Sequence, residues 1–139
     1  MSKTDKAREY FMKGYNCAQA VFTAWAEEMN MTEVQALRLS SSFGGGIGGM
    51  RDVCGAANAM FMVAGALKGY DMPDNMDAKQ QHYKRIQSMA EKMKKEYGTM
   101  LCLDLIALNE KDNLAAAKKP CLRYVEACVR ITEEMLTEE

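Results

Sequence analysis

Apolar residues recur at helical spacing along most of the chain, and no segment shows the sustained alternation of apolar and polar residues that marks a strand. The first amphipathic pattern covers residues 4–13. Asn16 then precedes a second pattern over residues 17–29, and Thr32 opens a third that runs to about residue 43. Asn and Thr side chains commonly accept hydrogen bonds from the free N–H groups at helix starts. We therefore predict helices over these three ranges.

The most apolar segment of the chain covers residues 53–69, between Asp52 and Gly69. It is apolar on nearly every side, which is typical of a helix buried in the centre of a fold. A membrane-spanning helix needs about 20 consecutive apolar residues. The uncharged run from Val53 to Leu67 is shorter than that, so we predict a buried helix capped by Asp52.

Three more helices follow from the remaining periodicity. One begins at Pro73–Asp74 and ends at Tyr97, a second covers residues 100–109 after Thr99, and the last begins at Pro120. The sequence therefore predicts an all-α fold in one domain, residues 1–139. We expect a compact multi-helix bundle with a central apolar helix at about 53–69 and a glycine-rich loop before it.

The net charge and the first ten residues limit the binding partners and the cellular location that we expect. The formal net charge is −1, which gives no reason to expect nucleic acid as a partner. Residues 1–10 carry no apolar segment of the signal-peptide type. We expect a soluble, cytoplasmic protein with no membrane partner, and a homodimer stays open.

Four of the five cysteines fall in the first turn of a predicted helix. These four are Cys17, Cys54, Cys102 and Cys121. Unpaired backbone N–H groups and the helix dipole stabilise an anion at this position, so they lower the pKa of a thiol and populate its nucleophilic thiolate. Cys128 lies in the middle of the last predicted helix and is expected to be unreactive.

Several motifs resemble those of one known family. They are GYNCAQAVF at 14–22, FGGGIGG at 43–49 and CGAANA at 54–59, followed by Cys102 and Cys121. Together they are similar to the redox-active proteins named for a C, CGAxxG, C, C cysteine pattern. The resemblance spans nearly the whole chain and implies a mainly helical, redox-active protein whose family cysteines are Cys17, Cys54, Cys102 and Cys121. Ala59 stands where the family motif has its second glycine.

The glycine loop has two interpretations. Gly44, Gly46 and Gly49 match GxGxxG, but a helix rather than a strand precedes them, which argues against a dinucleotide site. The N–H groups of the loop, with the Arg51 side chain, are candidates for an anion-binding concavity beside Cys54. The candidate glycines are Gly45, Gly46 and Gly48. The alternative is a sharp connection between two packed helices.

Our first hypothesis is a dithiol/disulfide oxidoreductase without a resident cofactor, acting on an unidentified thiol or disulfide redox partner. Cys54 is the preferred attacking residue, with a pKa below that of free cysteine, about 8.5. Cys17 is its preferred partner, and Cys102 and Cys121 form a second pair or a relay. No CxxC occurs in the chain, so any pairing joins different helices and the sequence leaves the connectivity open.

Two alternatives belong to other functional classes. Four thiolates from Cys17, Cys54, Cys102 and Cys121 would suit an iron–sulfur cluster or zinc in an electron-transfer or metal-binding module. The chain lacks the CxxC spacing usual in such sites. The second alternative is a helical interaction module that uses its cysteines as core residues.

Overall fold

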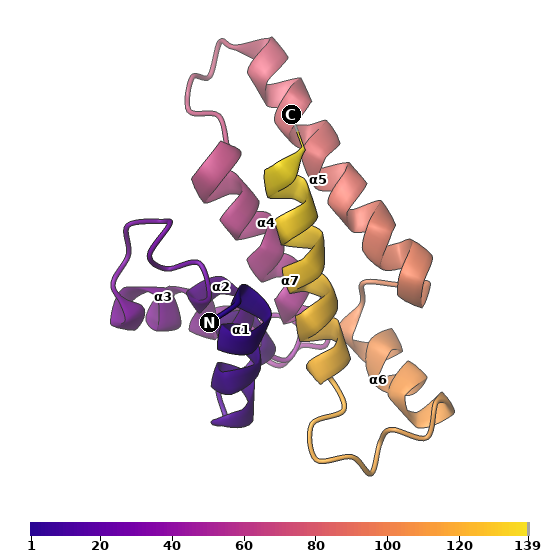
Figure 1. Ribbon diagram of the computed structural model, residues 1–139. Helices are drawn as coiled ribbons and strands as arrows, with labels where there is room; N and C mark the ends of the chain where they lie inside the picture. The colour runs from indigo at the N-terminus through magenta and orange to yellow at the C-terminus, as the bar shows by residue number, and fades with distance from the viewer. Residues whose placement is uncertain (139) are drawn as a thin grey trace.

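Seven α-helices and one short 3-10 helix form the regular structure of residues 1–138, the part of the chain that this computed structural model describes (Figure 1). They are α1 (Lys3–Met12), α2 (Cys17–Thr23), α3 (Glu33–Ser40), η1 (Ser41–Phe43), α4 (Gly55–Lys68), α5 (Met76–Tyr97), α6 (Cys102–Lys111) and α7 (Leu122–Thr137). In this described part, β pairing is limited to one isolated antiparallel bridge, between Val53 and Leu101. The predicted all-α fold is confirmed.

Capping residues in the sequence set where helices α2 and α3 begin. Asn16 and Thr32 both form capping boxes, in which the side chain accepts from the backbone of a glutamine three residues later and that glutamine bonds back. Helix α2 ends at Thr23 rather than continuing to residue 29, because Trp25 and Ala26 donate to carbonyls three residues back and tighten the chain into turns.

The predicted role of Asp52 as a helix cap is wrong. Helix α4 begins at Gly55, with Cys54 as its N-cap. Asp52 Oδ1 instead accepts from the N–H of Val53 at 2.9 Å, and the Asp52 carbonyl accepts from the N–H of Cys102 at 2.7 Å. Pairing with the start of α6 holds residue 52 outside the helix, because its backbone must follow the bridge.

The last three helices begin two or three residues later than predicted. Helix α5 begins at Met76 rather than at Pro73–Asp74, because Asn75 caps it and its side chain accepts from the N–H of Ala78 at 3.1 Å. Helix α6 begins at Cys102, and α7 begins at Leu122 with Cys121 as its N-cap. These shifts bring the cysteines nearer to the helix starts than the sequence predicted.

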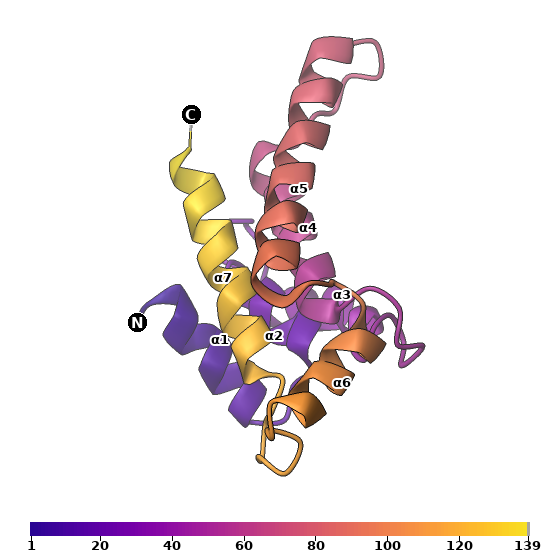
Figure 2. The ribbon, with the colours of Figure 1, turned by 90° about the vertical axis from the view of Figure 1, so that its right-hand side faces the viewer.

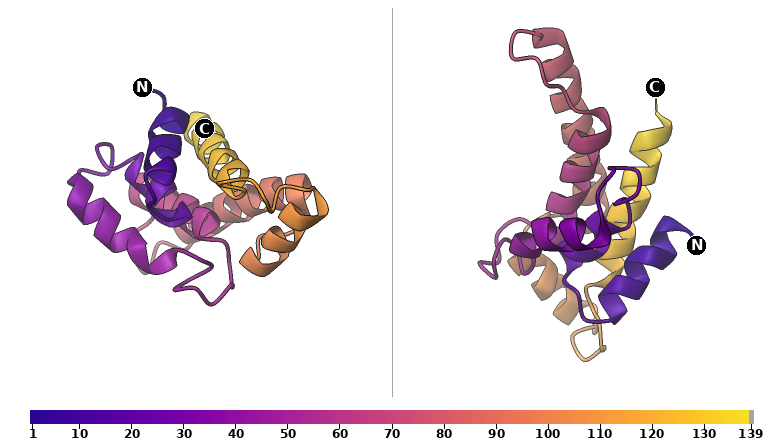
Figure 3. Two further views of the ribbon diagram at one scale, coloured as in Figure 1. Left: turned by 90° about the horizontal axis from the view of Figure 1, so that it is seen from below. Right: turned by 90° about the vertical axis from the view of Figure 1, so that its left-hand side faces the viewer.

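Helix α4 lies against α2, α5 and α7 (Figures 1 and 2). Its buried residues are mostly small, from Gly55 to Ala64, which lets the neighbouring helices approach closely. The first half of α5 extends with the end of α4 beyond the remaining helices (Figure 3). Among residues 1–138, no helix is both long enough and apolar enough to span a membrane.

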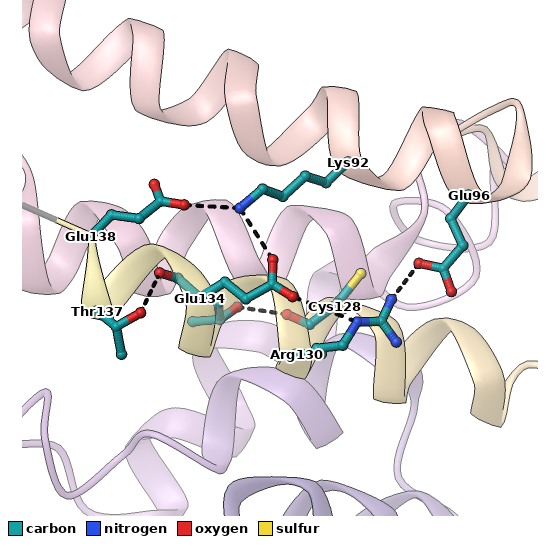
Figure 4. A network of polar contacts seen from close by, with 8 residues as sticks. Lys92, Glu96, Cys128, Arg130, Glu134, Thr137 and Glu138 are labelled. Carbon is teal, nitrogen blue, oxygen red and sulfur yellow. Dashed lines mark hydrogen bonds and ion pairs between the residues drawn. The ribbon is translucent and has the colours of Figure 1, made fainter.

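Helices α5 and α7 are joined at their surface by ion pairs (Figure 4). Lys92 contacts Glu134 at 3.1 Å and Glu138 at 2.9 Å, and Arg130 pairs with Glu96. Beneath them, the fully buried Cys128 lies 3.9 Å from the sulfur of Met93. Exposed pairs of this kind contribute little to stability, so the buried face between the two helices supplies most of this contact.

Candidate functional site

All four cysteines of the predicted site lie at a helix start. Cys17 and Cys102 are the first residues of α2 and α6, and Cys54 and Cys121 are the N-caps of α4 and α7. Cys17, Cys102 and Cys121 are partly exposed, while Cys54 is buried. Each sulfur therefore lies near backbone N–H groups that have no partner within their helix.

Gly55 allows the starts of α2 and α4 to meet. A Cβ atom at residue 55 would lie 2.8 Å from Cys17 Sγ and 2.5 Å from the carbonyl oxygen of Phe43. These distances are too short for any side chain, so only glycine lets the two helix starts approach this closely. The result is that the Cys54 thiol lies near enough to Cys17 to be the largest cause of its lowered pKa.

The isolated bridge brings the start of α6 to the same place. The N–H of Cys54 donates to the Met100 carbonyl at 2.8 Å, and the N–H of Cys102 donates to the Asp52 carbonyl at 2.7 Å. Gly46 completes this contact, since a Cβ there would lie 2.6 Å from Cys102 Cβ. The bridge and the glycine loop together hold Cys102 beside the start of α4.

The protein environment lowers the pKa of Cys17 to about 6. The main cause is the hydrogen bond from the Cys54 thiol, supported by the backbone N–H groups of Gly45, Ala56 and Ala18, while burial acts against them. A thiolate at the start of α2 therefore has donors from three segments of the chain. Cys17 is the cysteine of this site best suited to be a nucleophile near neutral pH.

The pKa of Cys54 is raised well above its usual value, which contradicts the prediction that it is the low-pKa thiol. The main cause is its interaction with the Cys17 sulfur, which favours the protonated Cys54 thiol, and burial adds to it. Of the backbone donors, only the N–H of Ala57 acts in the opposite direction. The helix start alone is too weak against a second thiolate and burial, so the thiolate is favoured at Cys17 rather than at Cys54.

The glycine loop serves the thiols differently from the predicted anion site. The N–H of Gly45 is the one that supports the Cys17 thiolate. Gly46 is buried and provides close packing, and the N–H of Gly48 donates to the Ser42 carbonyl at 2.7 Å, so it is not available to an anion. The predicted donor role of Gly48 is therefore wrong, because the loop closes on itself at that residue.

Arg51 lies beside Cys102 rather than Cys54. Its backbone has a φ of 62°, in the left-handed region, and its Nη1 lies 3.6 Å from Cys102 Sγ. The backbone N–H of Arg51 is used within the loop, where it donates to the Gly45 carbonyl at 3.0 Å. Arg51 therefore acts through its guanidinium group, which places a positive charge next to the Cys102 thiol.

Cys121 has a polar neighbour that the sequence analysis did not identify. Asn109, only 2% exposed, lies with its Nδ2 atom 3.5 Å from Cys121 Sγ. Burial raises the pKa of Cys121, and the Asn109 amide acts in the opposite direction. The available signal was spacing, since Asn109 follows Cys102 by two helical turns and so lies on the same face of α6.

Comparison with known families agrees with this arrangement. The family model described as "Putative redox-active protein (C_GCAxxG_C_C)" matches residues 15–135, which include all four cysteines and the glycine loop. The chain belongs to this family. No curated protein and no solved structure matches the chain.

Ala59 differs from the family motif and is fully buried in α4. It lies among the small side chains that face the neighbouring helices, where alanine fills the space next to Met60 and Val63. A buried position within the helix indicates that this residue contributes to packing.

Proposed function

We propose that the protein exchanges thiols and disulfides, with Cys17 as the attacking thiolate and Cys54 as the resolving thiol. The observation that carries this proposal is the close approach of the starts of α2 and α4 at Gly55, where the Cys54 thiol is the largest cause of the lowered pKa of Cys17. The same approach sets the two cysteines at neighbouring helix starts, which supports exchange of a disulfide between them. The redox description of the family supports the general class of activity.

The proposed reaction balances as follows. The Cys17 thiolate attacks one sulfur of a substrate disulfide, forms a mixed disulfide and releases the other substrate sulfur as a thiolate. Cys54 gives its proton to that leaving thiolate and attacks Cys17 Sγ. A Cys17–Cys54 disulfide forms and the second substrate thiolate departs, so the substrate has gained two electrons and the protein has lost two.

Cys102 and Cys121 supply the second pair or relay in this proposal. They are partly exposed, and Cys102 lies beside the Arg51 guanidinium, so an incoming redox partner can reach them more easily than the buried Cys54. We place the reaction in the cytoplasm, where thiols are kept reduced and disulfides are formed transiently. The redox partner is proposed to be a molecule that carries a thiol or a disulfide.

The test is the reaction of the reduced chain with oxidised glutathione, quenched in acid and followed by mass spectrometry. The native chain should form a Cys17–Cys54 disulfide, Cys54→Ser should stop at a glutathione adduct on Cys17, and Cys17→Ser should form neither. Cys128→Ala is the matched control, because Cys128 is fully buried and should leave the products unchanged. An adduct that first appears on another cysteine would overturn the assignment.

A second candidate function is metal or cluster binding by the same four cysteines. The charges of Cys17 and Cys102 both act on Cys121, so several thiols lie within electrostatic range of each other. Within residues 1–138, however, no three His, Cys, Asp or Glu side chains are arranged around one metal position. Anaerobic purification with metal and sulfide analysis decides between the candidates, because cysteines that resist alkylation until a chelator is added would favour the metal site.

A further inference from the structure

The amide of Asn109 is held in one orientation by its neighbours. Its Oδ1 atom lies 2.7 Å from the Tyr124 hydroxyl and 3.0 Å from Arg123 Nη2. The guanidinium is a donor only, so the oxygen must face it and the NH₂ group must face the other way. That leaves the donor directed at Cys121 Sγ, 3.5 Å away.

The group that fixes Asn109 is itself well anchored. Arg123 also pairs with Asp112 at 2.8 Å, and its guanidinium stacks on the rings of Tyr97 and Tyr124. The Tyr124 hydroxyl lies within 2.8 Å of the Leu105 carbonyl as well. A buried amide in such a network turns only at a high cost, because turning it would place NH₂ against the guanidinium.

The Asn109 amide faces a cysteine that has two other thiols nearby. Among the neighbouring thiols, the charge of Cys17 acts on Cys121 more strongly than that of Cys102. Cys102 in turn lies at the start of α6, the helix that carries Asn109. Cys121 therefore lies within electrostatic range of both Cys17 and Cys102.

We propose that Asn109 is a positioning residue that holds the Cys121 sulfur in one place, so that Cys121 carries a disulfide from the Cys17–Cys54 pair to Cys102. This inference rests on the proposed Cys17–Cys54 disulfide and passes it on to the second pair of cysteines. Cys121, as a thiolate, attacks Cys17 Sγ, and Cys54 leaves and takes up the proton that Cys121 lost. Cys102, as a thiolate, then attacks Cys121 Sγ, and Cys17 leaves as a thiolate while the proton that Cys102 lost passes to solvent. A Cys102–Cys121 disulfide remains. No external oxidant or reductant is needed for either transfer.

The test uses Cys102→Ser, in which the relay should stop at a Cys17–Cys121 disulfide. The chain is oxidised with one equivalent of oxidised glutathione, and the disulfides are mapped by mass spectrometry over time. Adding Asn109→Asp keeps an oxygen for Arg123 and Tyr124 but removes the donor to Cys121. The Cys17–Cys121 disulfide should then form about fivefold more slowly or worse, the factor that a typical lost hydrogen bond implies. Formation of the Cys17–Cys54 disulfide should be unchanged, a split that a general loss of stability would not produce.

Asn30→Asp is the matched control, because it makes the same chemical change at an exposed residue. If Asn109→Asp does not fold, Arg123→Lys is tested in its place. It keeps the positive charge but removes the planar group that orients the Asn109 amide, so it too should slow formation of the Cys17–Cys121 disulfide. Equal transfer rates with and without the donor overturn the role of Asn109 alone. If the Cys17–Cys54 disulfide never forms, the proposed function and the relay are both overturned. If the Cys17–Cys54 disulfide forms but the Cys17–Cys121 disulfide never does, only the relay is overturned.

Discussion

Replacement of Gly55 by alanine tests most directly how Cys17 and Cys54 are held together. The added methyl group would lie 2.5 Å from the Phe43 carbonyl oxygen and 2.8 Å from Cys17 Sγ. One of these atoms belongs to the backbone of η1, so η1 and the start of α4 must move apart, and the Cys17 sulfur at the start of α2 must shift as well. Overpacking of a core costs about 1–3 kcal/mol, which corresponds to a fall in Tm of about 3–10 °C for a chain of this size.

Gly65→Ala provides the matched control on the same helix. Gly65 also lies within α4, but a Cβ atom there meets nothing within 4 Å. Alanine is favoured over glycine inside a helix by about 0.5–1 kcal/mol. The two substitutions are therefore expected to change stability in opposite directions, although each adds the same methyl group to the same helix.

Thermal unfolding followed by circular dichroism measures both effects, and the glutathione reaction measures the consequence for the thiols. Gly55→Ala should lower Tm and also slow closure of the Cys17–Cys54 disulfide at temperatures where the chain stays folded. Gly65→Ala should raise Tm and leave closure unchanged. The reasoning is refuted if Gly55→Ala melts and closes its disulfide like the native chain, because α2 and α4 would then not approach as closely as described.

The remaining predictions concern Cys17 and the buried face of α4. The alkylation rate of Cys17 should rise with pH through a midpoint of about 6, and Cys54→Ala should move that midpoint upward because it removes the strongest donor to the thiolate; an unchanged midpoint would contradict this cause. Ala59→Gly should lower the free energy of unfolding in urea by about 1–2 kcal/mol through lost helix propensity and lost burial, without slowing exchange; a faster reaction would show that the family glycine serves the chemistry. Ala64→Asp places an unpaired carboxylate at a fully buried position and should abolish cooperative unfolding; near-native melting would place this face at the surface.

Local signals in the sequence predicted most of the helices. Capping boxes at Asn16 and Thr32 depend on residues three positions apart, so they are visible in the sequence and are formed in the structure. Asp52 looked equally good as a cap, but its backbone pairs with the start of α6. A contact between residues 52 and 102 cannot be inferred from local pattern, and it decided where α4 begins.

The composition of the site was predictable, but the roles within it were not. All four cysteines lie at helix starts as predicted, because proline, asparagine and turn residues mark those starts locally. Which thiol becomes the anion depends on donors from other segments, namely the Cys54 thiol and the N–H of Gly45. Asn109 was not predicted as a site residue for the same reason. Its amide is oriented toward Cys121 by Arg123 and Tyr124, which lie on another helix.

The electrostatics of the cluster favour one thiolate at a time. The charge of Cys17 raises the pKa of Cys54 and of Cys121, so ionisation of the first thiol keeps its neighbours protonated. In disulfide exchange this is an advantage, because each attack needs one thiolate and one proton for the leaving sulfur. A bound cation would reverse the order by stabilising several thiolates together. The proposed relay needs the four cysteines to share a single negative charge, whereas the alternative metal site needs an added positive charge to compensate for the repulsion.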